Sequence, residues 1–270
     1  MDHQDNQTPI TVLQITDSHL GEKPGSSLLG LDTDSSFIQV HELVTQQRGK
    51  ADWLLATGDI SNDGTVGSYQ RFRELSSSLA HQRVWLPGNH DDLLNMAQAT
   101  DDGPEMRKLI ELDHWVIVML NSAVPGKVGG NLSEPELKFL EASLDQHPTK
   151  HVLVCMHHHP IKSGCAWLDY QQIANSAALF NIIHRFSNVK ALLWGHIHQE
   201  IDRMEGDVRL LATPSSCIQF APNSDDFKLD RNTPGYRWLE LYPDGRFETA
   251  VSRLPIESIA NIDYHSVEGY

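Results

Sequence analysis

The stretch LLWGHIHQE, residues 192–200, places His196 and His198 two positions apart, directly after an apolar run. Two solvated imidazoles at the end of a strand are the ordinary explanation of such a pair. In an extended chain, however, residues i and i+2 project to the same side, so both rings could approach one point. A metal site would need further ligands elsewhere in the chain. The rest of the sequence therefore decides between these two interpretations.

The amino-acid composition is that of an ordinary globular protein. With 270 residues, of which 40% are hydrophobic, the chain is long enough for one large α/β domain spanning residues 1–270. The formal net charge of −15 argues against a nucleic-acid partner, because that binding depends on Lys and Arg at the phosphates. An anionic substrate would need a local concentration of positive charge, which bound divalent cations would supply.

The sequence shows no segment that directs a protein to a membrane or out of the cell. Residues 1–9, MDHQDNQTP, contain neither the basic nor the apolar region of a secretory signal. No apolar run approaches the roughly 18 residues that span a bilayer. Three cysteines, Cys155, Cys165 and Cys217, are too few and too scattered for a disulfide framework. We therefore expect a cytoplasmic protein that does not contact a membrane, and we find no signal for an oligomeric state.

Short apolar runs rich in β-branched residues alternate with longer amphipathic stretches along the chain. The runs that predict strands are residues 10–16, 53–57, 83–87, 115–121, 151–156, 191–194 and 208–213. The stretches that predict helices are residues 33–48, 66–80, 134–146 and 170–186. This alternation indicates an α/β layered fold.

Local signals refine this pattern in two places. Ser133 is the predicted N-cap of the helix over 134–146, with Glu136 completing a capping box. From about residue 205 onward the pattern changes to strands and loops, and Pro-Asp-Gly at residues 243–245 predicts a hairpin. No repeat or linker separates two halves of the chain, so a single domain is the simpler prediction.

Acidic, amide and imidazole side chains follow five of the predicted strands. They are Asp17 and His19, Asp59, the group Asn89, His90 and Asp91, then His157, and finally His196 with His198. Each position alone has an ordinary structural explanation, such as a turn residue, a helix N-cap or a hydrogen-bonded core histidine. Their recurrence behind successive buried strands has none, and Gly58, Gly88 and Gly195 precede three of the groups, where they allow close backbone approach. Because open α/β sheets place their sites at the carboxyl ends of strands, we expect a site at that edge.

These five groups resemble the signature of the calcineurin-like metallophosphoesterases, in order, chemistry and spread, over residues 13–198. A narrower resemblance, to the bacterial class III 3′,5′-cyclic AMP phosphodiesterases, extends over nearly the whole chain. It rests on the motifs VLQITDSHL, LPGNHD, HHHPIKSGCAWLD, GHIHQE, LLATPSSCIQF and the closing EGY. The resemblance implies a four-layer α/β/β/α sandwich and hydrolysis of cyclic AMP to 5′-AMP. The alternatives are a phosphodiesterase for another diester (a glycerophosphodiester, a 2′,3′-cyclic nucleotide or a nucleotide-linked lipid) and a non-catalytic scaffold. The intact ligand residues and His90 argue against the scaffold.

The resemblance also implies a centre of two divalent ions bridged by Asp59. One ion would be held by Asp17, His19, Asp59 and His198, and the other by Asp59, Asn89, His157 and His196. This mixture of hard oxygens and imidazoles suits iron or manganese, with zinc as the alternative. Two such ions would generate a bridging hydroxide that attacks phosphorus.

His90 is outside this ligand set and is expected to donate a proton to the leaving oxygen or to stabilise the phosphate oxygens, with Asp91 orienting it. Asn89 and His90 are also expected to contact the substrate.

Four further features carry weaker expectations. His158 and His159 are left out of the ligand set. Asn121-Ser122 stands where related proteins often have Asp-Ser. This difference leaves the expected metal ligands unchanged and concerns only the residues that contact those ligands. Trp167 or Phe220 would stack on a nucleobase, and an ordinary core role explains either aromatic equally well.

Overall fold

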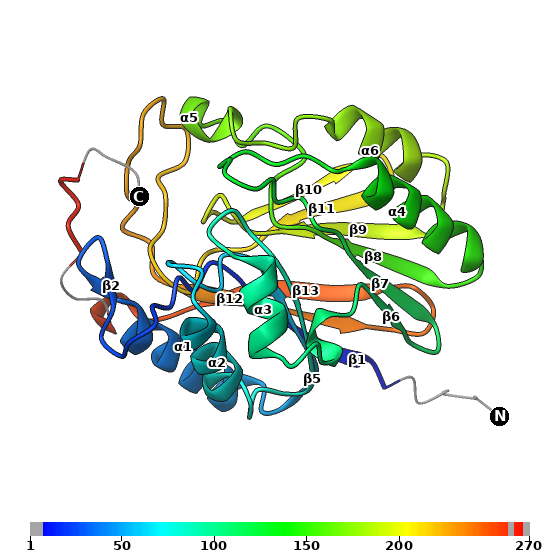
Figure 1. The fold of residues 1–270 in the computed structure, drawn as a ribbon. Coiled ribbons are helices and arrows are strands. Elements are labelled where there is room, and N and C mark those ends of the chain that lie inside the picture. Colours follow the sequence, from blue (N-terminus) through cyan, green and yellow to red (C-terminus); the bar gives the residue numbers. More distant parts are fainter. Residues whose placement is uncertain (1–7, 259–261, 267–270) are drawn as a thin grey trace.

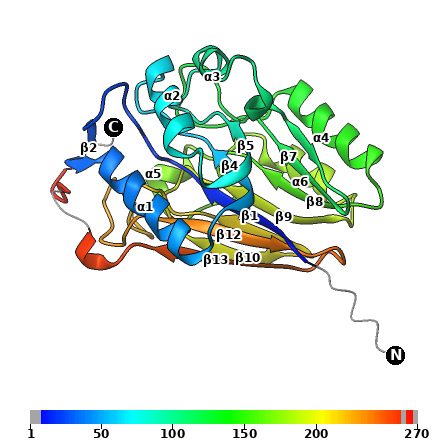
Figure 2. The same cartoon turned by 90° about the horizontal axis from the view of Figure 1, so that it is seen from below.

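Two β-sheets lie face to face at the centre of the computed structural model, and helices cover their two outer faces (Figures 1 and 2). The structure describes residues 8–258 and 262–266. Residues 1–7, which contribute to the expectation that no secretory signal is present, lie outside the described residues. The closing EGY, residues 268–270, lies outside them as well.

The first sheet has five strands and combines the two ends of the chain. In spatial order they are β13 (Phe247–Arg253), β12 (Gly235–Leu241), β1 (Ile10–Ile15), β4 (Ala51–Thr57) and β5 (Ala80–Leu86). β1, β4 and β5 run parallel, whereas β12 pairs antiparallel with β1. β12 and β13 form the predicted hairpin, and the Gly245 N–H donates to Tyr242 O at 3.0 Å in its turn. The C-terminal part therefore completes the sheet in which the first strand lies.

The second sheet has six strands. In spatial order they are β10 (Ile201–Glu205), β11 (Val208–Ala212), β9 (Val189–Trp194), β8 (His151–Cys155), β7 (Trp115–Met119) and β6 (Leu109–Glu111). The four central strands β11, β9, β8 and β7 are parallel, and the edge strands β10 and β6 are antiparallel to their neighbours. A short hairpin of β2 (Ser27–Leu28) and β3 (Leu31–Asp32) stands apart from both sheets.

Helices cover the outer face of each sheet. On the first sheet they are α1 (Thr33–Gln47), α2 (Val66–Leu75) and α3 (Leu93–Ala99), and on the second α4 (Glu134–Gln146), α5 (Ala166–Asp169) and α6 (Ser176–Ile183). Two short 3₁₀ turns, Pro104–Met106 and Ile256–Ser258, complete the structure. None of the helices in the described ranges has both the length and the apolar character that crossing a bilayer requires.

The space between the two sheets is filled by apolar side chains from both. Val12 and Leu55 of the first sheet share one cluster with Ile117 and Leu193 of the second, and each is at most 1% exposed. Separate apolar clusters lie under the helices on each outer face. Strands buried on both faces read as continuous apolar runs, which is how they were predicted. The α/β/β/α sandwich that the resemblance implied is confirmed.

Two predicted helices have the wrong bounds. The helix predicted over 66–80 ends at Leu75, because the following serine-rich residues form turns and Ala80 already pairs with Ala51 in the sheet. Of the helix predicted over 170–186 only Ser176–Ile183, α6, is helical, and a loop joins it to α5, which ends at Asp169. In that loop the Ile173 N–H donates to His159 O at 3.0 Å instead of to a helical carbonyl.

Other local features also differ from the prediction. α3, β6 and β10 were not predicted, since each is short and its hydrophobic period is weak. Ser133 does cap α4, because its side chain accepts the Glu136 N–H. The Glu136 carboxylate accepts from the Asn121 N–H at 3.0 Å and pairs with Lys108, so it does not return to Ser133 as a capping box requires.

Candidate metal centre

Five loops, each following one strand, meet across the ends of the two sheets. They carry Asp17 and His19 after β1, Asp59 after β4, Asn89 after β5, His157 after β8, and His196 with His198 after β9. The Asp17 N–H donates to Gly58 O at 3.0 Å, which joins the first two loops. The His196 N–H donates to the Asp17 carboxylate at 3.1 Å, which joins the second sheet to the first. The fold thus brings all seven predicted ligand residues together.

Five of these residues have a backbone conformation that side-chain-bearing residues seldom adopt. Asp17, His19, Asp59, His196 and His198 have φ values of 53°, 47°, 46°, 64° and 48°. An extended chain therefore does not explain why His196 and His198 both reach the site, and that part of the prediction is wrong. Left-handed residues gathered at one place are typical of functional sites, where the surrounding structure holds them.

The glycines that precede the ligands make room for them, as predicted. A Cβ at Gly88 would lie 2.1 Å from Asp59 Oδ1 and 2.7 Å from His157 Nε2. A Cβ at Gly195 would lie 2.0 Å from Thr16 Oγ1 and 2.5 Å from Asp17 Oδ2. Any side chain at these two positions would push the predicted ligands away from the site.

The first group of candidate ligands comprises Asp17, His19 and His198. Their ligand atoms all lie within 4.8 Å of one another. His198 Nε2 is 3.3 Å from Asp17 Oδ1 and 3.4 Å from His19 Nε2. The other ring nitrogen, His198 Nδ1, donates to Ile218 O at 2.8 Å, which fixes the tautomer and leaves the Nε2 lone pair directed at the group.

The second group comprises His157, Asn89 and His196. His157 Nδ1 donates to Thr57 O at 2.8 Å, and its Nε2 lies 3.2 Å from Asn89 Oδ1. His196 Nε2 is buried and has no hydrogen-bond partner among the described residues. A buried nitrogen without a partner is costly in a protein interior, and a metal ion would satisfy it.

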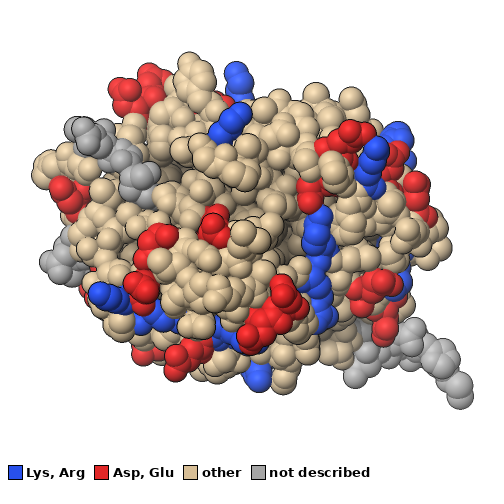
Figure 3. Space-filling view, viewed as in Figure 1, with Lys and Arg blue, Asp and Glu red and all other residues tan. Residues whose placement is uncertain are grey.

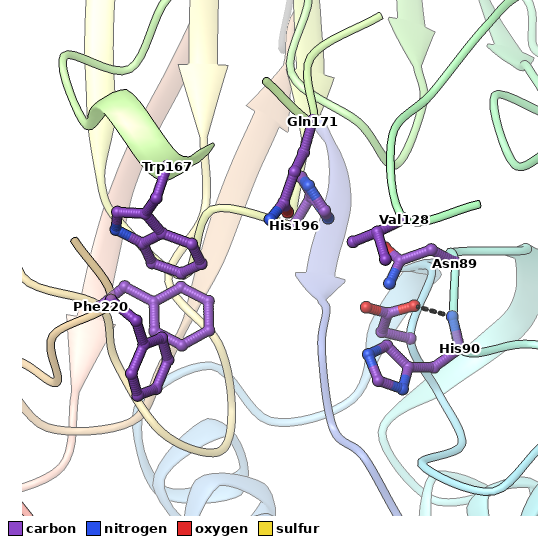
Figure 4. Close-up of a pocket in the computed structure, with 9 residues that line it drawn as sticks. Asn89, His90, Val128, Trp167, Gln171, His196 and Phe220 are labelled. Carbon is purple, nitrogen blue, oxygen red and sulfur yellow. Dashed lines mark hydrogen bonds between the residues drawn. The ribbon is translucent and has the colours of Figure 1, made fainter. Parts of the chain in front are cut away.

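Asp59 lies between the two groups. Its Oδ2 is 3.2 Å from His157 Nε2 and 3.9 Å from His19 Nε2. Its Oδ1 accepts the His90 N–H at 2.9 Å (Figure 4). A single carboxylate placed in this way can contact ions held by both groups.

The protonation states of the metal-free site follow from burial and from the Asp59 charge. Burial disfavours the charge of Asp59, but His157 beside it lowers the pKa of Asp59 well below its usual value. Burial alone would lower the pKa of His157, and the adjacent Asp59 carboxylate instead raises it to about 9. Burial lowers the pKa of His19 and His196 well below the usual value, so both imidazoles are neutral, as metal ligands must be.

His158 lies close to the second group, but both of its ring nitrogens form hydrogen bonds with residues outside that group. Its ligand atom is within 4.8 Å of those of His157 and His196. Its Nε2 donates to Val128 O at 3.0 Å, and its Nδ1 pairs with Ser122 Oγ at 2.8 Å. Both nitrogens are in use, and burial lowers the pKa so that the ring is neutral. These contacts support leaving His158 out of the ligand set.

Two further predicted features lie beside the ligands. His159 stacks on the His196 ring, with centroids 5.5 Å apart and planes 16° from parallel. In the Asn121-Ser122 pair, Ser122 orients His158, and Asn121 Oδ1 accepts the Ala123 N–H at 2.9 Å.

Asp91 holds the loops on either side of the site together. Its carboxylate accepts the backbone N–H groups of Ile60, Ser61 and Gly88 at 3.3, 3.0 and 2.8 Å. Burial, followed by repulsion from Asp59, raises the pKa of this carboxyl to about 6. These bonds join the loop after β4 to the loop after β5, in which Asn89 and His90 lie.

A pocket of about 180 Å³ opens beside the candidate ligands. Asp59, Asn89 and His90 line one side of it, and three aromatic side chains, Trp167, Phe220 and Phe227, line the other, as Figure 4 shows for the labelled residues. Gln171 and His196 lie between the two sides, and Val128 lies beside Asn89. Sequence reasoning missed Phe227, Gln171 and Val128, because they lie in loops without a period or motif of their own.

The Trp167 and Phe220 positions refine the expectation that one of them stacks on a base. Phe220 stacks on His198, with centroids 4.2 Å apart and planes 10° from parallel. It also meets Trp167 edge to face at 5.0 Å, and Trp167 meets Phe227 in the same manner at 5.2 Å. Phe220 therefore packs against a candidate ligand, and the three rings form one continuous apolar side of the pocket.

Comparisons with known proteins agree with this geometry. Residues 10–200 match the family described as calcineurin-like phosphoesterase. The chain is 43% identical to the 3′,5′-cyclic adenosine monophosphate phosphodiesterase CpdA of Pseudomonas aeruginosa, covering 97% of this chain and 95% of that protein. It is 38% identical to the 3′,5′-cyclic-nucleotide phosphodiesterase alr5338 of Nostoc sp., covering 95% and 98%. A dimetal phosphatase of Danio rerio shares the fold at 17% identity, with a TM-score of 0.55 over 91% of this chain and 99% of that one.

Proposed function

The chain belongs to the calcineurin-like phosphoesterase family, and we propose that it is a metal-dependent phosphodiesterase that hydrolyses 3′,5′-cyclic AMP to 5′-AMP. The observation that carries the proposal is the position of Asp59 between two groups of ligand side chains. The cyclic nucleotide as substrate is supported by relatives with that activity in their names, which align over nearly the whole chain.

The side chains fit two divalent ions. One ion would be held by Asp17, His19, Asp59 and His198, and the other by Asp59, Asn89, His157 and His196. The unpartnered, buried Nε2 of His196 is the clearest sign of this fit. Carboxylate and amide oxygens combined with imidazoles, without a thiolate, favour iron or manganese, with zinc as the alternative.

The negative net charge of the molecule favours bound cations at a site for an anionic substrate. The chain carries a formal net charge of −15, and the carboxylates of Asp17 and Asp59, which are part of that total, lie in the site itself. On the face seen in Figure 3, basic side chains are interspersed with acidic ones and form no broad basic area. Bound ions would supply at the site the positive charge that attracts a phosphodiester.

When bound, two such ions polarise the phosphate and lower the pKa of a water to give hydroxide at neutral pH. The contribution of the chain is to hold the ligands rigidly. Thr57 O and Ile218 O accept from the Nδ1 atoms of His157 and His198, which turns both Nε2 atoms toward the site. Burial keeps bulk water away and strengthens every charge interaction inside.

His90 is the residue that we propose moves a proton. Hydrolysis adds water across the P–O3′ bond, so the ribose 3′ oxygen leaves as an alkoxide that needs a proton, and the phosphate stays on the 5′ oxygen. His90 lines the pocket beside Asp59 and Asn89 and is outside the proposed ligand set. Its imidazole would protonate the leaving oxygen or stabilise the phosphate oxygens. Asp91 would act on His90 by holding its loop.

We propose that the chain acts as one catalytic unit over residues 1–270. The ligand residues come from both sheets, and β12 and β13 complete the sheet that contains β1. We also propose that it works in the cytoplasm. Cys155, Cys165 and Cys217 are buried free thiols, which is compatible with a reducing compartment.

Hydrolysis of an acyclic diester is the second candidate function. A hollow of about 350 Å³ shares Asn89 with the first pocket and is also lined by Leu93, Leu94 and Asn121. An acyclic diester has two separate substituents, and two hollows that share Asn89 as a lining residue would accommodate one each.

Turnover of a panel of diesters at matched metal loading tests the proposal. The panel consists of cyclic AMP, cyclic GMP, 2′,3′-cyclic AMP, glycerophosphocholine and bis(p-nitrophenyl) phosphate. We expect cyclic AMP to give 5′-AMP with the highest kcat/KM among the natural diesters, and metal analysis to find two ions per chain. A metal-loaded protein that leaves cyclic AMP intact while cleaving an acyclic diester would replace the proposed function with the second candidate.

A further inference from the structure

Gln171 projects into the pocket between its aromatic side and the candidate ligands (Figure 4). It lies directly after α5, the short helix that carries Trp167. The carboxamide of Gln171 has no hydrogen-bond partner among the described residues, although its position is only half exposed. A carboxamide whose carbonyl oxygen and NH2 group are both unpaired, held at the side of a pocket, is available to a ligand.

The backbone that carries this side chain is held firmly. The Gln171 N–H donates to Leu168 O at 2.8 Å, and Gln171 O accepts from the Gly130 N–H at 3.2 Å. Gly130 O in turn accepts from the Ala174 N–H at 2.9 Å. The turn is therefore fixed to the loop that also carries Val128, while the carboxamide at its tip is unpartnered.

Comparison with the neighbouring Gln172 shows that an unpaired side-chain amide facing the pocket is specific to Gln171. Gln172 is equally half-buried, but its Nε2 donates to Ser176 Oγ at 3.4 Å, at the start of α6. Gln172 is not among the residues that line the pocket. The two adjacent glutamines thus differ in one respect, which is whether the amide faces the pocket.

We propose that Gln171 reads the hydrogen-bonding edge of the substrate's nucleobase while Trp167, Phe220 and Phe227 contact its faces. This inference rests on the proposed function, because it assumes a cyclic nucleotide in the pocket. A carboxamide presents an acceptor and a donor side by side, which matches the N6 amino donor and adjacent ring-nitrogen acceptor of adenine. Aromatic side chains supply apolar contact with the faces of any base, so they do not distinguish adenine from guanine by its hydrogen-bonding edge.

A change from amide to carboxylate gives the inference a directional test. A carboxylate only accepts, so Gln171→Glu loses its match to adenine, whose edge includes a ring-nitrogen acceptor. The Watson–Crick edge of guanine instead presents two adjacent donors, N1–H and the N2 amino group, which a carboxylate can accept together. We therefore expect Gln171→Glu to move the preference from cyclic AMP toward cyclic GMP.

The experiment compares kcat/KM for cyclic AMP, cyclic GMP and bis(p-nitrophenyl) phosphate in wild type, Gln171→Leu, Gln171→Glu and the control Gln172→Leu. All four proteins are measured at equal metal content. The base-free diester serves as reference, because general damage to the site or repulsion by the new carboxylate lowers all three rates and cancels in the ratios. For Gln171→Leu we expect the ratio of cyclic AMP to the reference to fall about 10-fold, within the usual worth of a base contact. For Gln171→Glu we expect the ratio of cyclic AMP to cyclic GMP to fall by at least about 10-fold. Gln172→Leu keeps both ratios at their wild-type values.

The possible failures are distinct. If wild type hydrolyses cyclic AMP and the Gln171 variants keep all ratios, Gln171 does not read the base. If Gln172→Leu changes the ratios as much as Gln171→Leu, the effect comes from the turn and the inference is wrong. If metal-loaded wild type cleaves only the base-free diester, the proposed function fails first, and the inference fails with it.

Discussion

The two sides of the pocket are built in opposite ways. On the metal side, Asp17, His19 and Asp59 are buried, have left-handed backbone and are held by bonds between loops. On the aromatic side, Trp167 and Phe227 lie half-exposed in a short helix and a loop. The difference shows where this fold requires accuracy. Ligands must be placed before any ion or substrate arrives, whereas the proposed contact with the faces of a base makes a smaller demand on exact position.

The accuracy of the metal side has an energetic cost. A left-handed residue other than glycine costs about 1–3 kcal/mol, and five of them lie in this site. The cost is sustained because the loops are tied together, with the His196 N–H on the Asp17 carboxylate and the His19 N–H on Asp59 O. Binding of ions would stabilise the same conformation further.

The largest expected effect comes from removing the charge shared by the two ligand groups. Asp59→Asn keeps the shape of the side chain but replaces one carboxylate oxygen with an amide nitrogen, which cannot ligate. We expect loss of metal retention together with a fall in turnover of at least about 10⁴-fold, since hydroxide is then not generated at neutral pH. The measurements are metal content after gel filtration and hydrolysis of cyclic AMP.

Asp63→Asn is the matched control for this variant. Asp63 lies in the same loop, but its carboxylate accepts from the backbone of Glu22 and Thr65. We expect Asp63→Asn to keep both ions and turnover. Two ions per chain and a near-normal rate in Asp59→Asn would show that this carboxylate does not bridge them.

The second effect separates the proposed proton donor, His90, from a candidate ligand, His196. His90→Ala is expected to retain both ions and to lose about 10²- to 10⁴-fold in turnover, the usual worth of a positioned acid. The loss should shrink for bis(p-nitrophenyl) phosphate, whose leaving group needs little protonation. His196→Ala should instead lose metal first, which metal analysis of both variants resolves. An equal loss with both substrates would assign His90 to charge stabilisation, and an empty site in His90→Ala would make it a ligand.

The third effect is the pH dependence of metal binding. In the metal-free protein the Asp59 carboxylate raises the pKa of His157 to about 9, so this imidazole is protonated at pH 7. An ion must displace that proton, because only the neutral ring binds a metal. The apparent affinity should therefore rise by about 10-fold per pH unit between pH 7 and 8.5. Competition with a chelator measures the affinity, and calorimetry in two buffers measures the released proton. An affinity that is flat across this range would contradict the protonated His157.

The metal side was far more predictable from the sequence than the aromatic side. Asp17, Asp59 and His157 each follow a buried strand, and parallel strands bring their carboxyl ends to one edge. Glycines at close approaches, such as Gly88, added a signal that steric geometry explains. Signals of this kind exist wherever the backbone itself is constrained.

Where side-chain contacts decide, the sequence was less informative. Nothing around Gln171 or Phe227 distinguishes a pocket residue from an ordinary loop residue, because their roles depend on segments far away in the chain. The first turns of the helix predicted over 170–186 are absent for the same reason, since hydrogen bonds to Gly130 and His159 replace helical ones before α6 begins. Left-handed backbone at His196 and His198 was also invisible, because it follows from contacts with the other sheet.

The smallest expected effect tests whether the two sides of the pocket are as independent as they look. Phe220 belongs to the aromatic side, yet it stacks on His198 at 4.2 Å. Phe220→Leu removes the flat surface that holds this imidazole beside Asp17, while Ile218 O still fixes its tautomer. Residues that orient a ligand are worth about 10- to 100-fold in metal affinity, and with the hydrogen bond retained we expect the lower end.

Phe227→Leu is the control, because Phe227 meets Phe220 and Trp167 edge to face and lies in the same pocket. Metal affinity measured without substrate should fall about 10-fold in Phe220→Leu and remain unchanged in Phe227→Leu, whereas both variants should raise KM for cyclic AMP. If both variants lose metal affinity equally, the aromatic side supports the centre as a unit. If neither does, the ligands are held by their own loops alone, and the two sides are independent.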